Sequence, residues 1–68
     1  MEKYYVNTQA QPNGDHEVHN ARCSYLPSIV NRVYLGEFSS CKSAVAEGKK
    51  YYPKADGCFH CSPTCHKQ

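Results

Sequence analysis

The chain has 68 residues, a formal net charge of +2 and five cysteines. This length excludes more than one domain, so we expect a single domain over residues 1–68. The mild positive charge excludes the strongly basic surface that is typical of a dedicated nucleic-acid binder. A chain this short buries little apolar surface, and so needs a metal, disulfides or a partner to stay folded.

The five cysteines can form either a metal site or disulfides. Which of the two forms depends mainly on whether the cellular compartment is reducing or oxidising. The first residues, Met1 to Tyr5, contain no apolar segment of the secretory type. The longest apolar runs are a few residues, far short of a membrane span. We therefore expect a cytoplasmic protein with reduced thiols. An odd cysteine count also fits a disulfide framework poorly, so the sequence favours a metal.

Residues 3–8 are rich in strand-favouring types and predict a first β-strand. Residues 9–15 form a loop, marked by Asn13-Gly14, because both residue types tolerate positive φ. Residues 15–19 then predict a short strand that pairs back on the first. Residues 20–26 predict one helical turn that ends at a proline.

Residues 32–38 predict a second clear strand, with Val33 and Leu35 on one face and Tyr34 on the other. Residues 40–52 predict the main helix, since a serine can cap its start and a proline stops its end. Residues 54–57 predict a turn. The expected fold is α+β, a small antiparallel sheet with one main helix, stapled by a single metal site. The predicted helix has an apolar face with helical spacing: Cys41, Ala44, Val45, Gly48, Tyr51 and Tyr52.

Two cysteine-bearing segments supply the predicted metal ligands. Cys58 and Cys61 have the C-x2-C spacing with which a tight turn directs two thiolates at one ion, and the preceding Gly57 suits such a turn. His19 and Cys23 are four residues apart, so a helical turn places them on one side. The predicted ligands of one structural metal are His19, Cys23, Cys58 and Cys61.

Other residues compete for these roles. His16 is interpreted as a residue beside the site or on the surface. Cys65 is an alternate ligand in place of His19, or a thiol that hydrogen-bonds to the site. Cys41, on the apolar helix face, is interpreted as a small buried hydrophobic residue. The second arrangement is a fully local C-terminal site, formed by Cys58, Cys61, Cys65 and His66.

The chemistry of four ligands predicts a structural site. Four protein ligands close the tetrahedron and leave no position for a reactive water. Zinc is favoured over iron because one ligand is a histidine. The sequence contains no phosphate-binding glycine loop and no H-E-x-x-H motif, so we do not expect an enzyme. A thiol-active protein that uses Cys65 or Cys41 is the alternative from a different class.

The order of the motifs resembles the metal-binding domain of Ada-type DNA repair proteins and, more closely, small free-standing bacterial Ada-like zinc modules. The resemblance runs from Tyr5 to Cys61. The matching positions are His19, Cys23, Asn31-Arg32-Val33-Tyr34, Ser39 and Ser40, Ala44, Tyr52-Pro53, and Cys58-Phe59-His60-Cys61.

The resemblance implies one zinc ion held by His19, Cys23, Cys58 and Cys61. In the repair proteins the first cysteine of the first pair accepts a methyl group from DNA phosphotriesters. Here that place is His19, which cannot act as a thiolate acceptor. The resemblance therefore implies a small zinc-binding module, with DNA as one partner class. The alternative is a protein-interaction module that uses whichever tyrosines are exposed among Tyr4, Tyr5, Tyr25, Tyr34, Tyr51 and Tyr52.

Overall fold

A computed structural model describes residues 1–67, and Gln68, the last residue of the predicted domain, lies outside the described residues. The predicted α+β class, with a small sheet and one main helix, is confirmed. The elements in chain order are β1 (Glu2–Asn7), β2 (His16–Asn20), η1 (Ile29–Asn31), β3 (Arg32–Phe38), α1 (Cys41–Gly48), β4 (Ala55–Gly57) and η2 (Pro63–Cys65).

The four strands form one sheet in the order β3-β1-β2-β4. β1 is antiparallel to both β2 and β3, as predicted, but β4 runs parallel to β2. The sheet is therefore mixed, and the prediction of a turn at residues 54–57 is wrong. Aspartate and glycine are poor strand formers, so this three-residue segment becomes a strand only because β2 offers it hydrogen-bond partners.

The loop between β1 and β2 turns where the sequence predicts it. Gly14 has φ +91°, a left-handed conformation that glycine adopts freely. Its N–H donates to the Gln11 carbonyl over 2.7 Å, and the Asp15 N–H donates to Asn13 Oδ1 over 2.9 Å. The turn sets the register of the hairpin, in which Tyr5 lies opposite His19.

The strand β3 alternates as predicted and carries one irregularity. Leu35 is buried and Tyr34 is exposed. The register against β1 shifts between Tyr4 and Tyr5, beside Gly36, whose φ is +125°. This positive φ marks a bulge that curls the sheet edge.

The core lies between the sheet and α1. Its buried hydrophobic residues are Tyr4, Val6, Val18, Leu35, Ala44 and Ala55.

The helix α1 ends at Gly48, four residues before the predicted end at residue 52. The N–H groups of Tyr51 and Tyr52 both donate to the Gly48 carbonyl, which closes tight turns in place of a further helical turn. Glycine is a poor helix former and here lies against the sheet, since a Cβ on Gly48 would meet Val18 Cγ2 at 3.1 Å. The helix thus stops where it touches β2.

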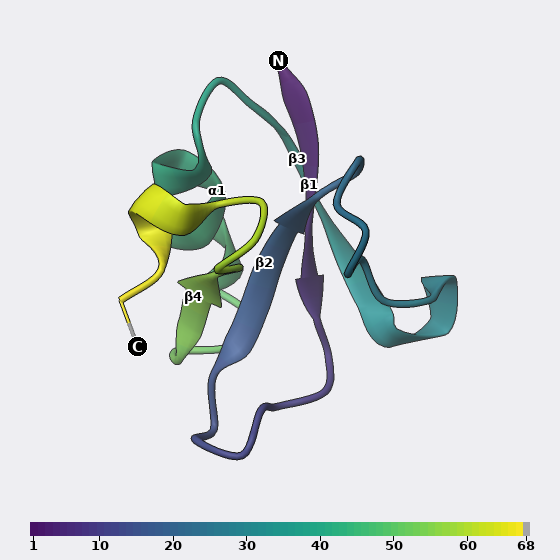
Figure 1. Cartoon of the computed structure of the whole chain (residues 1–68), viewed down its shortest axis with the longest axis vertical. Coiled ribbons are helices and arrows are strands. Elements are labelled where there is room, and N and C mark those ends of the chain that lie inside the picture. Colours follow the sequence, from purple (N-terminus) through teal and green to yellow (C-terminus); the bar gives the residue numbers. More distant parts are fainter. Residues whose placement is uncertain (68) are drawn as a thin grey trace.

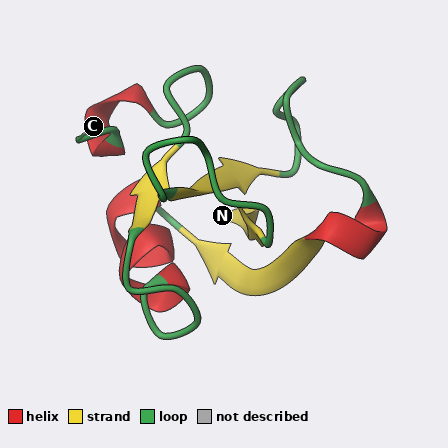
Figure 2. Cartoon of the chain, turned by 90° about the horizontal axis from the view of Figure 1, so that it is seen from below, coloured by secondary structure: helices red, strands yellow, loops and turns green. Residues whose placement is uncertain are grey.

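Figure 1 shows α1 beside the strands, with the C-terminal η2 segment (yellow) crossing it. Seen from below, α1 and the short η1 lie at opposite ends of the sheet (Figure 2). Within residues 1–67, no helix has the length and apolar character needed to cross a membrane.

Candidate metal centre

His19 enters the site from the end of β2. Successive side chains of a strand point to opposite faces. Val18 packs into the core beneath α1, and His19, the next residue, projects the other way. Even so, only 1 % of His19 is exposed to solvent. The residue is buried because the two cysteine-bearing loops cover it.

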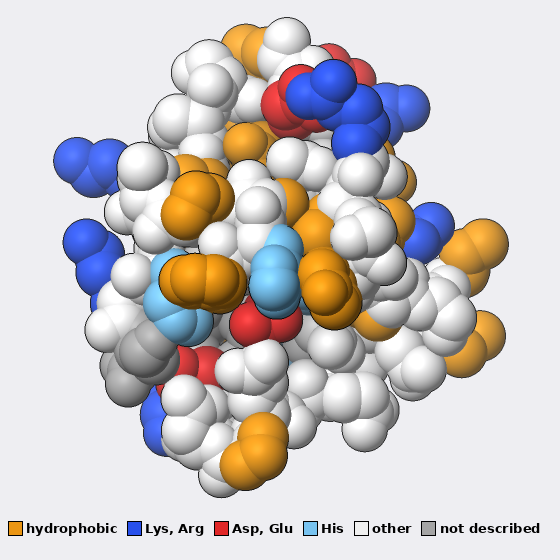
Figure 3. Space-filling view, in the orientation of Figure 1, with side chains coloured by type: hydrophobic (Ala, Val, Ile, Leu, Met, Phe, Trp, Pro, Cys, Tyr) orange, Lys and Arg blue, Asp and Glu red, His pale blue; other side chains and the backbone are white. Residues whose placement is uncertain are grey.

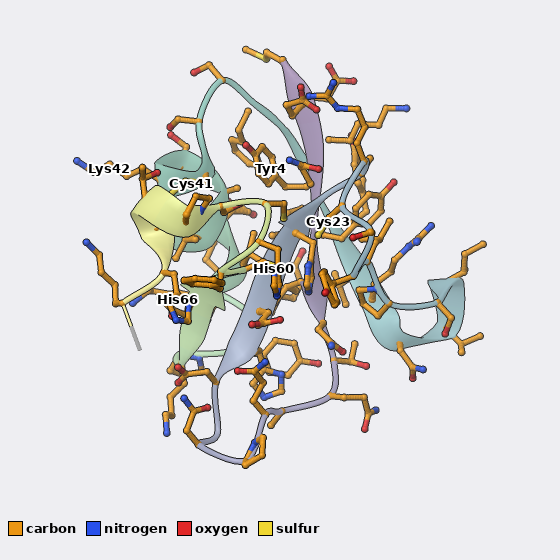
Figure 4. All side chains as sticks on the ribbon, in the orientation of Figure 1. Tyr4, Cys23, Cys41, Lys42, His60 and His66 are labelled. Atoms are coloured by element: carbon orange, nitrogen blue, oxygen red, sulfur yellow. A yellow bond between two sulfur atoms is a disulfide. The ribbon has the colours of Figure 1, made fainter. Side chains whose placement is uncertain are left out.

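Cys23 reaches the site through two turns that follow β2. The Cys23 N–H donates to the Asn20 carbonyl over 3.1 Å, and the Leu26 N–H donates to the Cys23 carbonyl over 3.1 Å. These are single tight turns, so the predicted helical turn over residues 20–26 is not a helix. They still bring Cys23 back to the end of the strand that carries His19 (Figure 4).

Cys58 and Cys61 follow β4, and the parallel pairing with β2 places them. The Cys58 N–H donates to the Val18 carbonyl over 3.0 Å, which continues the ladder to the residue beside His19. The Ser62 N–H then donates to the Cys58 carbonyl over 2.8 Å and folds the chain into a tight loop. The C-x2-C motif therefore depends on β4, the strand that the sequence did not predict.

Gly57 has a different role from the predicted one. Among the described glycines, only Gly14 and Gly36 have positive φ, so Gly57 does not supply an unusual backbone conformation. Instead, a Cβ at this position would lie 2.6 Å from Cys65 Cβ and 2.8 Å from its carbonyl carbon. Glycine is required because the C-terminal segment packs directly on the backbone here.

One potential ligand atom from each of His19, Cys23, Cys58 and Cys61 lies within 4.8 Å of the others. The Sγ atoms of Cys23 and Cys58 are 3.9 Å apart. Three sulfurs and one imidazole are the donor set that zinc and related soft-ligand metals use. The structure thus brings together the four predicted residues, and their arrangement suits a metal ion. Their role as ligands stays a prediction.

The histidine ring gives the sharpest test of this fit. Both His19 ring nitrogens are buried and lack a hydrogen-bond partner among residues 1–67. Nε2 lies 3.5 Å from Glu17 Oε1, without hydrogen-bond geometry. A buried polar atom without a partner is costly, on the order of 1–3 kcal/mol. A metal ion would satisfy one nitrogen, and the Glu17 carboxylate is close enough to orient the other.

Each of the three sulfurs accepts one backbone hydrogen bond over 3.4 Å. The Asn20 N–H donates to Cys61, the Tyr25 N–H to Cys23, and the His60 N–H to Cys58. A thiolate gains more than a thiol from such donors, because hydrogen bonds to charged groups are the stronger ones. The loops therefore suit sulfurs that carry negative charge.

In the metal-free chain, burial disfavours the charged forms of the histidine and of two cysteines at the site. Burial, with a smaller contribution from His60, lowers the pKa of His19 to about 4. Burial also raises the pKa of the Cys58 and Cys61 thiols, and backbone N–H donors partly offset this. The imidazole is thus neutral at pH 7 and ready to coordinate. The thiols must be deprotonated in order to bind a metal, so metal binding would release their protons to solvent.

The remaining cysteines contradict three predictions. Cys41 and Cys65 form a disulfide that joins α1 to η2, whereas Cys23, Cys58 and Cys61 are free. Cys41 is therefore not a free buried residue, and Cys65 is not an alternate ligand. The expectation of reduced thiols without a disulfide is also wrong, because one disulfide is formed beside the four-residue group that suits a metal. Three of the five cysteines form the four-residue group with His19, and the other two form the disulfide. The odd cysteine count is therefore compatible with a disulfide.

The two alternate histidines lie outside the group. His66 Nδ1 is 3.1 Å from the Gly57 carbonyl and 3.4 Å from Asp56 Oδ2. The local C-terminal site is therefore not formed. His16 Nδ1 is 2.9 Å from the Asn7 carbonyl, and its ring stacks on Tyr52 with centroids 3.8 Å apart. His16 is a packing residue at the base of β2.

Aromatic rings line up across the loops that hold the site. Tyr25 stacks on His60 with centroids 4.1 Å apart, and Phe59 makes edge contacts with His60 at 5.4 Å and His66 at 5.5 Å. Tyr25 and Phe59 are about 60 % exposed (59 % and 61 %). Figure 3 shows this alternation of histidine and hydrophobic side chains across one face. We call Tyr25, His60, Phe59 and His66 the aromatic strip.

Comparisons with protein-family models, with curated proteins and with solved structures find no match to this chain.

Proposed function

We propose that the chain is a small module built on one structural zinc ion, held by His19, Cys23, Cys58 and Cys61. The observation that carries the proposal is the buried His19 ring, which faces three thiols and has no partner among residues 1–67. Zinc accepts this mixed sulfur and nitrogen set in a tetrahedron. Four protein donors leave no open position, so the ion would stabilise the fold and not act on a substrate.

The small amount of regular structure around the site supports a structural role for the ion. β4 has three residues, and the loops after β2 and β4 contain little regular structure. Structural zinc contributes on the order of 10–16 kcal/mol in small domains. An ion bound by His19, Cys23, Cys58 and Cys61 would tie both loops to β2 at one point.

Elemental analysis of the natively purified protein tests the proposal, and we expect one zinc ion per chain. Cobalt substitution should give the visible spectrum of a tetrahedral site with thiolate ligands. Cys23→Ser and Cys58→Ser should each abolish binding, because each removes one of four donors. Chelation should remove the cooperative unfolding transition.

His16→Ala is the matched control for His19→Ala, since both histidines lie on β2 and only His19 belongs to the group. His19→Ala should lose zinc, and His16→Ala should retain it. Full zinc occupancy in Cys23→Ser or His19→Ala would refute the four-ligand site. A chelated protein that still unfolds cooperatively would show that the ion is not structural.

For the partner, we propose single-stranded nucleic acid bound on the aromatic strip. The support is the row of rings on the loops that the metal would fix, because exposed aromatic rings stack on bases without sequence preference. The resemblance to Ada-type domains points to the same partner class. The low net charge predicts weak binding that falls with added salt.

Fluorescence anisotropy with a labelled single-stranded DNA tests this proposal. Phe59→Ala should weaken binding by roughly tenfold, as expected for one lost base stack of about 1–3 kcal/mol. Tyr34→Ala is the control, because Tyr34 is an exposed ring on β3, outside the strip. Equal effects of the two variants, or no binding at low salt, would refute it. A mass that rises with protein concentration would then favour the protein-interaction alternative.

A further inference from the structure

A second site of chemical interest lies at the disulfide, apart from the metal centre. A groove of about 540 Å³ runs between α1 and the C-terminal segment. This volume lies within the range of small-molecule sites. Cys41 and Cys65 both line the groove and are half-buried, so the disulfide lies at the wall of a space that a small molecule can enter.

The position of Cys41 favours its departure as a thiolate. Cys41 is the first residue of α1, and Figure 4 shows it beside the C-terminal turn. The Ser40 side chain makes no capping hydrogen bond, and the first turn of α1 has no acidic residue. The partial positive charge of the helix start is therefore not offset there. Such positions lower the pKa of a thiol, and a thiol of low pKa is the better leaving group.

A hydroxyl group stands beside both sulfurs. Thr64 Oγ1 lies 3.5 Å from Cys41 Sγ and 4.0 Å from Cys65 Sγ. When the disulfide opens, this hydroxyl can donate to the thiolate that forms.

Three lysines, Lys42, Lys49 and Lys67, also line the groove, and no ion pair holds their ammonium groups within residues 1–67. The acidic residue of the groove, Asp56, already accepts two hydrogen bonds from the Lys67 backbone N–H and lies near His66. Three ammonium groups against one carboxylate leave the lining of the groove positive, and this favours an anionic reactant.

We propose that the Cys41–Cys65 disulfide is a thiol–disulfide exchange site for small anionic thiols. The thiolate of the incoming molecule attacks Cys65 Sγ, forms a mixed disulfide and releases Cys41 as a thiolate. A second molecule attacks the mixed disulfide and releases Cys65. The protein disulfide gains two electrons and two protons, and the two small thiols leave joined as their own disulfide. The lysines raise the local concentration of the anionic reactant, and Thr64 stabilises the leaving thiolate.

The test uses the metal-loaded protein with reduced glutathione as the anionic thiol and 2-mercaptoethanol as the neutral one. Differential alkylation and mass spectrometry follow Cys41 and Cys65. Rates are compared per concentration of thiolate. We expect glutathione to react at least about tenfold faster at low ionic strength, with the advantage lost at high salt.

Two variants separate the attraction of the anionic thiol by the lysines from the stabilisation of the leaving thiolate by Thr64. Lys49→Gln should reduce the preference for glutathione. Lys50→Gln is its matched control, because Lys50 pairs with Glu47 and does not line the groove. Thr64→Val should slow both thiols by roughly tenfold, as expected for a lost hydrogen bond to a charged group. Equal rates for the two thiols, or equal effects of Lys49→Gln and Lys50→Gln, would overturn the proposal.

A separate measurement addresses the leaving group. In Cys65→Ser, Cys41 is a free thiol, and the pH dependence of its alkylation gives its pKa. We expect a value clearly below the ordinary 8.5 or so for cysteine. An ordinary value would overturn the assignment of Cys41 as the leaving group. If Cys65→Ser does not fold, the Thr64→Val rates test the leaving group instead. An unchanged rate would show that the Thr64 hydroxyl does not stabilise the Cys41 thiolate, and would overturn the assignment.

Discussion

Replacing Gly57 by alanine tests the contact between the C-terminal segment and β4. The added Cβ would lie 2.6 Å from Cys65 Cβ, 2.8 Å from its carbonyl carbon and 2.9 Å from its carbonyl oxygen. Carbon atoms in good contact are about 3.5–4.0 Å apart, so the overlap is about 1 Å. Two of these three atoms belong to the backbone, so rotation of a side chain cannot relieve the overlap. We expect Gly57→Ala to cost about 1–3 kcal/mol of unfolding free energy.

Thermal unfolding of the metal-loaded protein measures this cost. For a domain of this size, 2 kcal/mol corresponds to a fall in melting temperature of about 10 °C. The control is the same substitution in a Cys41→Ala background. There the disulfide no longer holds Cys65 against Gly57, so the C-terminal segment can move away and the penalty should shrink by about half or more. An equal penalty in both backgrounds, or no measurable penalty, would refute the reasoning.

Replacing both Cys41 and Cys65 by alanine should cost about 3–4 kcal/mol, because the disulfide closes a loop with a sequence separation of 24. Urea unfolding measures this, and unchanged zinc content would show that the two staples are separate. Acidification should destabilise the protein. Burial lowers the pKa of His19 to about 4, whereas an unfolded histidine titrates near 6.5. The unfolded state therefore binds more protons between these values, and stability falls as pH falls through that window, by about 2 kcal/mol between pH 7 and pH 5. In the metal-loaded protein, protons also compete with the ion for its ligands, so denaturation midpoints at these two pH values should show at least this loss. Stability that does not change over this range would contradict it. Glu17→Gln should weaken zinc binding by about tenfold in competition with a chelator, since the carboxylate lies 3.5 Å from His19 Nε2. Unchanged affinity would show that Glu17 does not orient the ring.

The sequence predicts the parts of the fold that have a strong local pattern. The alternation in residues 32–38 and the Asn13-Gly14 turn both agree with the structure, because each reflects a preference of the residues themselves. The helix was placed correctly at its start. Its end was not, because Gly48 stops the helix against β2, and a pattern of apolar residues does not reveal such a contact.

The strand β4 shows why other parts were not predictable. Its residues, Ala55, Asp56 and Gly57, have no strand preference of their own, and its pairing with β2 joins segments that are distant in the chain. A short segment of this kind takes its conformation from its neighbours. The parallel orientation of β4 and β2 depends on this same pairing, so the sequence does not predict it either.

Spacing and the resemblance predict one group of four ligands, and the structure brings the same four residues together. The disulfide was missed for a physical reason. Cys41 has the spacing of a core residue, and Cys65 the spacing of a further ligand, so each has a plausible role without the other. Only the path of β4 and η2, which places Cys65 over the start of α1, reveals the pair.

The disulfide and the candidate metal centre lie at neighbouring points of one weak strand, β4. β4 is three residues long, lies at the edge of the sheet and ends beside Cys58. On one side of Gly57, a metal at Cys58 would fix the chain to His19 and hence to β2. On its other face, the disulfide fixes Cys65 to α1 and presses the C-terminal segment against Gly57. A strand this short gains little from its own hydrogen bonds, so its place in the sheet depends on the disulfide just beyond it, and a bound metal would add a second tie at Cys58.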